Sequence, residues 1–269
     1  MKKSLFFVFI IFFTFISFSA GWYDLGEAGF YGEYSQYHST AVDSKGTVYV
    51  AFQNSAYRTT VMKFDGSGWV NVGNPAVSES NAEYINIVFD SSDTPYVAFS
   101  DLNWGDMSRK LSVMKFDGTN WSYVGTRQFT AGDAGFVKLV IDKVDDLWVA
   151  FKDSSQTEKA TVMKFDGTTW NVVGSAGFSA GAAYYIGFDV SVSGIPYLGY
   201  VKYDAPDQYK PFVMKFDGVS WATIGDFGPI GADNFSLKTT SDDLPVIAYR
   251  HWGLDGVQVK KYNEIGDTW

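Results

Sequence analysis

The six-residue phrase VMKFDG occurs four times in this chain, at residues 61–66, 113–118, 162–167 and 213–218. A set of tryptophans follows the same spacing, with successive members about 50 residues apart. Its members are Trp22, Trp69, Trp121, Trp170, Trp221 and Trp269. A fixed period of this length indicates a repeat architecture, a solenoid or a propeller, in which every repeat is one small supersecondary unit.

Each repeat reads as four short β-strands. In the second repeat the expected strands are Tyr84–Phe89, Pro95–Phe99, Leu111–Phe116 and Trp121–Val124. Aromatic and β-branched residues dominate these runs, and turn-forming Asp, Ser and Gly separate them. We see no helical periodicity after the first 19 residues.

Four antiparallel strands in about 50 residues is the size of a propeller blade, so the sequence predicts an all-β, five-bladed β-propeller. The expected repeats span residues 27–73, 74–125, 126–174, 175–225 and 226–269. Because the fifth repeat ends where its fourth strand would begin, we expect residues 22–26 to join the last blade and close the ring. A truncated sixth blade is the alternative.

The first residues form a separate segment. Lys2 and Lys3 precede an apolar run that ends in small residues, which predicts a signal peptide at 1–19 and a propeller at 20–269. The protein would then be secreted, extracellular or periplasmic, with no membrane insertion after cleavage. A retained membrane anchor is the alternative, although the run is shorter than the roughly 20 residues that a spanning helix needs.

Composition excludes several functions. The formal net charge is −9, which argues against nucleic acid as a partner because phosphate backbones are bound through clustered Lys and Arg. The chain has no cysteine, so disulfides and thiolate chemistry are excluded. His38 and His251 are its two histidines, too few for a usual metal cluster. We therefore expect no metal and no cofactor.

The acidic residues predict turns rather than catalysis. Most of them recur at the same place in the repeats, where the carboxylate is expected to form hydrogen bonds with the backbone of its own turn. They are Asp43, Asp90 and Asp142 after the first strands, and Asp65, Asp117, Asp166 and Asp217 in the hairpins between the third and fourth strands. Asp189 alone lies inside an expected first strand, and one carboxylate makes no acid pair, so we expect no catalytic residue.

The loops between the second and third strands differ most between repeats, and variable loops on a rigid scaffold are where binding residues concentrate. They carry aromatic side chains beside charged ones, a mixture that suits sugar rings and hydroxyls. The candidate ligand-binding residues are Trp104, Asp106, Arg109, Tyr203, Asp204, Tyr209, Arg250, His251 and Trp252. The alternative is that these are ordinary exposed loop residues.

Two further aromatic sets recur. Phe30, Phe129 and Phe178 lie in loops of nearly constant length before the first strands, and we expect them to fill the joints between blades. A second set opens the first strands and should lie near the mouth of the central channel: Tyr37, Tyr84, Phe136, Tyr185 and Phe235. Packing between blades and stacking against a ligand are both open for this second set.

The phrase VMKFDGTTW resembles the last two strands of kelch repeats, although AF or AY stands where kelch repeats have Gly-Gly. Five blades with strands of the FDSSDTPYVAF kind are also similar to tachylectin-type lectin propellers and to repeat propellers of secreted bacterial proteins. This resemblance implies a non-catalytic, lectin-like protein that binds carbohydrate, and we expect it to be a monomer. A surface protein as partner, in a protein-interaction or structural role, and a glycoside hydrolase are the alternatives.

Overall fold

The computed structural model describes residues 21–204, 208–228 and 231–269. Within these ranges the secondary structure consists of nineteen strands and one short 3-10 helix, η1 (Ser154–Gln156). The expected signal peptide at 1–19 lies outside the described residues. Among the described residues, no helix has both the length and the apolar character that crossing a membrane requires.

The strands form five antiparallel sheets, here called blades 1 to 5 in chain order. Blade 1 contains β1 (Gln36–Val42), β2 (Val48–Gln53), β3 (Thr59–Phe64) and β4 (Trp69–Asn71). Blade 2 contains β5 (Ala82–Phe89), β6 (Pro95–Leu102), β7 (Arg109–Phe116) and β8 (Trp121–Tyr123). Blade 3 contains β9 (Ala134–Ile141), β10 (Leu147–Asp153), β11 (Lys159–Phe165) and β12 (Trp170–Val172).

Blade 4 contains β13 (Ala183–Val190), β14 (Pro196–Asp204), β15 (Gln208–Phe216) and β16 (Trp221–Thr223). Blade 5 contains β17 (Ala232–Thr239), β18 (Pro245–His251) and β19 (Gly256–Lys261). In the place of its fourth strand, blade 5 has an isolated bridge between Asn263 and Thr268.

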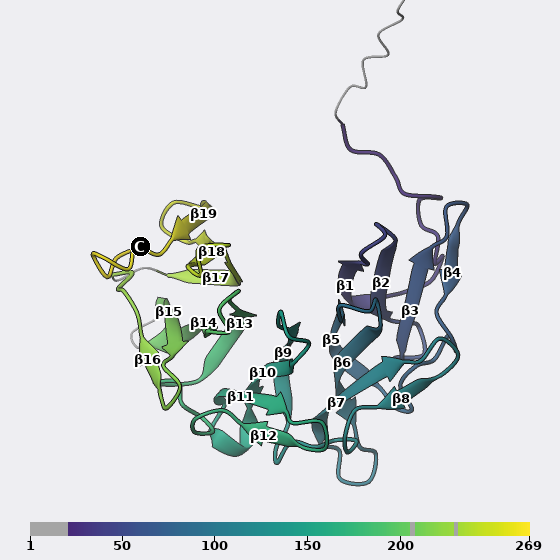
Figure 1. Ribbon diagram of the computed structural model, residues 1–269, viewed down its shortest axis with the longest axis horizontal. Helices are drawn as coiled ribbons and strands as arrows, with labels where there is room; N and C mark the ends of the chain where they lie inside the picture. The colour runs from purple at the N-terminus through teal and green to yellow at the C-terminus, as the bar shows by residue number, and fades with distance from the viewer. Residues whose placement is uncertain (1–20, 205–207, 229–230) are drawn as a thin grey trace, which may run out of the picture.

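The five blades follow one another along a curve, with the first strand of each blade on the inner side (Figure 1). Each blade is a simple meander in which every strand pairs with the next one in sequence. The all-β, five-bladed propeller that the repeats predict is therefore confirmed. The core lies between the blades: Leu111 and Val113 of blade 2 pack in one cluster with Val137, Leu139 and Phe151 of blade 3.

The recurring tryptophan joins each blade to the segment before it. Trp121 Nε1 donates to the carbonyl of Val72 at 2.8 Å, and Trp170 Nε1 donates to that of Val124 at 2.9 Å. The following glycine lies close to the ring with a positive φ, as Gly125 does at +73°, which explains the Gly of the repeated phrase. Phe129 stacks on Trp170 with 4.8 Å between ring centroids, and Phe30 and Phe178 stack on other tryptophans of the set. The expected joint-filling role of these phenylalanines is confirmed.

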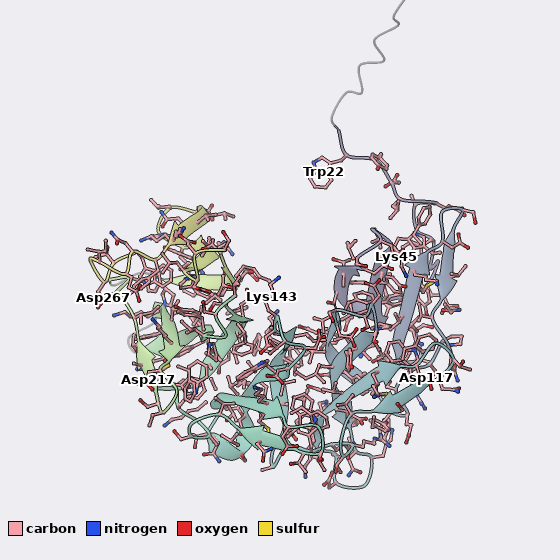
Figure 2. All side chains as sticks on the ribbon, in the orientation of Figure 1. Trp22, Lys45, Asp117, Lys143, Asp217 and Asp267 are labelled. Carbon is pink, nitrogen blue, oxygen red and sulfur yellow. The ribbon has the colours of Figure 1, made fainter. Side chains whose placement is uncertain are left out.

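The expected closure of the ring by residues 22–26 is wrong. Blade 5 is a three-stranded sheet, and blades 1 and 5 stand apart at the two ends of the curve (Figure 1). Trp22 projects into solvent, clear of every blade (Figure 2). The carbonyl of Leu25 instead accepts the Trp69 indole N–H at 2.8 Å, and Gly26 lies against that ring.

The physical reason is that the apolar residue and the glycine after each recurring tryptophan contact the tryptophan of the next blade. Leu25 and Gly26 accordingly contact Trp69 of blade 1. Residues 25–26 therefore occupy the place that the end of a preceding blade's fourth strand would take on blade 1. In blade 5, Trp269 makes the corresponding joint to blade 4 by donating to the carbonyl of Ile224 at 3.2 Å.

The turn-forming role of the recurring acids is confirmed. Asp43 Oδ1 accepts the backbone N–H groups of Lys45 and Thr47. In the hairpin between β11 and β12, Asp166 Oδ1 accepts those of Thr168 and Thr169 at 2.8 and 2.7 Å. These hydrogen bonds lower the pKa of Asp166 to about 2 from its ordinary 3.8, and the bond from Thr169 has the largest effect.

Because the pKa of Asp166 is lower in the folded state than in the unfolded chain, folding favours the deprotonated carboxylate. Its contribution to stability is fully present above pH 3.8 and is lost as the pH falls through about 2. We expect Asp166→Ala to unfold at lower urea than the wild type near neutral pH, and this difference to shrink across that window. Urea unfolding at a series of pH values measures it, and a difference that does not change with pH would contradict the assignment.

Candidate functional site at the mouth of the channel

The inner strands of all five blades line one cavity of about 370 Å³. It opens at the end of the channel where β1, β5, β9, β13 and β17 begin, and we call this opening the mouth. The aromatic set at the start of the first strands lines it, together with polar side chains that include His38, Asn86 and Lys138. The mouth therefore combines aromatic faces with hydrogen-bonding groups on a rigid wall.

The residue that opens each inner strand has an unusual backbone. Tyr37, Tyr84, Phe136 and Tyr185 have φ values of 50° to 53°, in the left-handed region that bulky side chains rarely adopt. The ladder between first and second strands shifts register at the same place in every blade. The repeated bulge turns these rings toward the cavity, and backbone strain of this kind is typical of binding sites.

Phe235 borders the mouth cavity as expected, but the residue with the left-handed backbone in blade 5 is its neighbour Asn234. Asn234, with a φ of 51°, takes the place in blade 5 that the tyrosines and Phe136 hold elsewhere. Phe235 is buried in the cluster between blades 4 and 5.

Four rings form a continuous row, which we call the aromatic arc: Tyr37, Tyr84, Phe136 and Tyr185. Neighbouring ring centroids lie 5.3, 5.4 and 5.5 Å apart. Burial, and then the nearby charge of Glu83, raises the pKa of both Tyr37 and Tyr84. Their hydroxyls therefore remain protonated and available as donors at neutral pH.

Charged side chains flank the aromatic arc on blades 2 and 3. Glu83, which precedes Tyr84 on β5, accepts from Arg109 Nε at 3.2 Å. Lys152 at the end of β10 forms an ion pair with Glu158, and its Nζ lies 5.8 Å from the ring centre of Phe136. These groups could bind the hydroxyls of a ligand whose apolar face stacks on the arc.

The flank on blades 4 and 5 is aromatic and charged as well. Tyr209 contacts Tyr184 and Trp252, with ring centroids 6.0 and 5.2 Å apart. The Trp252 indole N–H donates to Asp233 at 3.0 Å, and Arg250 forms an ion pair with the same carboxylate. The structure thus brings together three of the residues predicted from the loops.

The other predicted residues lie elsewhere. Trp104 is 63% exposed at the tip of its loop, and Asp106 accepts from Ser108 to shape the same turn. His251 Nδ1 accepts the backbone N–H of Leu254, also a turn contact. Tyr203 and Asp204 lie on β14, where their backbones pair with β15, and their side chains are outside the description. Among the candidates whose side chains are described, none lines the mouth cavity itself, but Arg109, Tyr209, Arg250 and Trp252 belong to contact networks that include Glu83, Tyr184 and Asp233, each next to a lining residue.

Sequence reasoning missed five residues of the flanks. They are Glu83, Lys152, Glu158, Tyr184 and Asp233. A signal was available, because the position before the aromatic arc varies between blades and holds an acid in blades 2 and 5. Variation next to a recurring strained residue is therefore a signal for a site, because backbone strain concentrates at functional positions.

Two other candidates for chemistry are structural. Asp189 Oδ2 accepts the backbone N–H of Thr239 at 2.8 Å and its Oδ1 binds Lys238, so this acid joins blade 4 to blade 5. A larger hollow of about 730 Å³ lies between blades 2 and 3, but its acids, such as Asp146 and Asp166, belong to an ion pair and a turn. Within the described ranges, no group of three or more potential ligands could hold a metal ion.

No family model matches the chain, and no curated protein matches it. Solved structures do match. An endo-arabinase from Bacteroides thetaiotaomicron is 13% identical with a TM-score of 0.52, over 83% of this chain and 92% of that chain. A PL25 ulvan lyase bound to -[GlcA(1-4)Rha3S]- is 10% identical with a TM-score of 0.58, over 83% and 68%. A protein of unknown function from Dyadobacter fermentans is 14% identical with a TM-score of 0.55, over 86% and 79%.

These comparisons contradict the expectation of a non-catalytic, lectin-like protein, because the similar propellers with stated activities are named as enzymes: an arabinase and a polysaccharide lyase. The resemblance to tachylectin-type and kelch propellers holds only as far as the propeller fold itself. At these identities the likeness to solved structures establishes the fold of this chain.

Proposed function

We propose that this protein is a carbohydrate-active enzyme that cleaves a polysaccharide chain bound across the mouth. The aromatic arc carries the proposal. Four rings in a row, about 5 Å apart and fixed by the same bulge in four blades, offer successive platforms for the CH-rich faces of sugar rings. The similar arabinase and lyase propellers support polysaccharide as the substrate class.

Glu83 is the residue that we assign to proton transfer. Glu83 flanks the aromatic arc, because it directly precedes Tyr84 on β5. Arg109 holds that carboxylate in position at 3.2 Å. Hydrolysis and elimination both need a positioned group that moves a proton at the scissile linkage, and a carboxylate serves either reaction.

The signal-peptide pattern at 1–19 supports a place of action outside the cytoplasm, where polysaccharides are accessible. We propose a secreted or periplasmic enzyme on this basis.

The test is cleavage of a polysaccharide panel by the wild type, Glu83→Gln and Glu79→Gln. Glu79 is the matched control, because it is also a glutamate paired with an arginine, Arg127, but lies away from the mouth. We expect Glu83→Gln to lose about 100-fold or more in kcat while it retains substrate binding, and Glu79→Gln to stay near the wild type. Release of reducing ends measures both. Equal activity of all three proteins would contradict the assignment of Glu83, and cleavage of no polysaccharide would overturn the proposed function.

A further inference from the structure

Among the described residues that line the mouth cavity, Lys138 is the one lysine, and none is an arginine, aspartate or glutamate. It lies on β9, two positions after Phe136 of the aromatic arc. It is half-buried, and no ion pair or hydrogen bond within the described ranges includes its ammonium group. An uncompensated cation in a partly desolvated site is costly, so its presence calls for an explanation.

A structural role does not explain it. At the equivalent position of blade 1, Ser39 Oγ accepts the backbone N–H of Ile87 from blade 2 at 3.2 Å. In blade 2, Asn86 Oδ1 accepts that of Leu139 from blade 3 at 3.4 Å. A lysine ammonium has no acceptor and cannot make this bond to the next blade. Lys138 therefore departs from a joint that the preceding blades share.

The surrounding charges favour an anion. Burial lowers the pKa of Lys138, and the positive charge of Lys238 on β17 lowers it further. Lys238 Nζ donates to Asp189 Oδ1 at 3.2 Å, so this carboxylate is already paired with another lysine. The other polar groups that line the cavity are neutral amides, hydroxyls and the His38 imidazole. An anionic group placed here would offset the charge of Lys138 and gain a charge-assisted hydrogen bond.

We propose that the substrate is an acidic polysaccharide and that Lys138 binds its anionic substituent, a carboxylate or a sulfate ester. This inference rests on the proposed function and specifies its substrate class. The aromatic arc would hold the sugar rings while Lys138, two positions along the strand from Phe136, holds the charge that those rings carry.

The experiment measures binding and cleavage of four polymers by the purified wild type at low salt. Polygalacturonate carries carboxylates, carrageenan carries sulfates, and arabinan and galactan are neutral. We expect about tenfold or greater preference for one or both anionic polymers, and which of the two is preferred identifies the substituent.

Lys138→Gln is expected to abolish that preference, and Lys143→Gln to retain it. Lys143 is the matched control, because it lies on blade 3 in the exposed turn at the opposite end of β9 (Figure 2). Lys138→Gln removes a half-buried charge that has no partner within the described ranges, so the variant is expected to fold. Cleavage of the neutral polymers alone, or an anionic preference that survives Lys138→Gln, overturns this inference and leaves the proposed function standing. Binding of none of the four, together with no cleavage of the wider panel, overturns both.

Discussion

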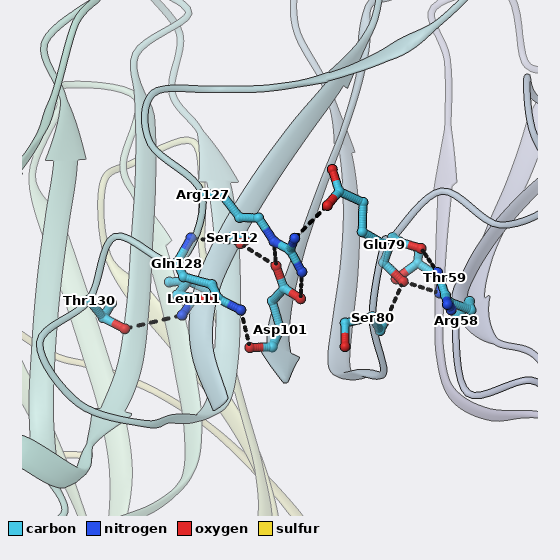
Figure 3. Close-up of polar contacts among 11 residues, drawn as sticks. Arg58, Thr59, Glu79, Ser80, Asp101, Leu111, Ser112, Arg127, Gln128 and Thr130 are labelled. Atoms are coloured by element: carbon cyan, nitrogen blue, oxygen red, sulfur yellow. Dashed lines mark hydrogen bonds and ion pairs between the residues drawn. The ribbon is translucent and has the colours of Figure 1, made fainter. Parts of the chain in front are cut away.

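Replacing Arg127 with alanine is expected to lower the free energy of unfolding by about 3–5 kcal/mol. Asp101 at the end of β6 is fully buried, and the guanidinium of Arg127 donates to both of its oxygens at 2.7 and 2.9 Å (Figure 3). Ser112 Oγ donates to the same carboxylate at 2.9 Å. Without Arg127 the buried charge loses its counterion, and one hydroxyl cannot replace it.

Urea unfolding of two further variants distinguishes the contribution of the buried Arg127–Asp101 pair to stability from that of the exposed Arg127–Glu79 pair. Glu79→Gln removes the exposed carboxylate on the other side of the same guanidinium and is expected to cost less than about 1 kcal/mol. Arg127→Ala combined with Asp101→Asn removes both charges and should recover part of the loss. If Arg127→Ala costs no more than Glu79→Gln, the buried pair does not contribute as described.

Trp170→Ala is expected to cost about 3–5 kcal/mol, because the residue joins two blades in several ways. Its ring is buried, stacks on Phe129 with an interplanar angle of 7°, and lies against Gly125. Its indole N–H also donates to the carbonyl of Val124 in the preceding blade. The substitution therefore removes a large apolar contact and a hydrogen bond together.

Trp170→Phe is the matched control for this prediction. It keeps an aromatic ring for Phe129 but removes the indole N–H, so we expect a loss closer to about 1–2 kcal/mol, part of it from the smaller ring. Chemical unfolding followed by far-ultraviolet circular dichroism, which does not depend on tryptophan fluorescence, measures both variants. A cost for Trp170→Ala below that of the Phe variant would contradict the role of this tryptophan as the joint between blades.

The blades could be predicted well from the sequence because every blade needs the same turns and the same packing against its neighbour. A recurring Asp such as Asp166 solves the same turn, and a recurring Trp such as Trp170 fills the same joint, so both appear at a fixed period. Ring closure could not be predicted in this way. The phrase at 22–26 looks like a missing strand, but its last residues serve the neighbouring Trp69, and the sequence does not say which tryptophan they contact.

The candidate site was only partly predictable, for a related reason. The aromatic arc recurs and was visible, but its positive φ and its bulge belong to the backbone and have no residue signature beyond position. Glu83 and Lys138 each occur once, in strands that otherwise look like packing elements. The roles proposed for them depend on their surroundings in the folded protein. Arg109 pairs with Glu83, and no acceptor within the described ranges pairs with the Lys138 ammonium group.

The most direct test of a polysaccharide site at the mouth is a crystal structure of the Glu83→Gln variant with an oligosaccharide from the polymer that the wild type cleaves best. We predict sugar rings stacked along the aromatic arc, with the substituted side chain of β5 beside a glycosidic linkage and any anionic substituent within hydrogen-bond distance of Lys138 Nζ. Sugar bound instead at an outer loop such as that of Trp104, with the mouth empty, would contradict the account.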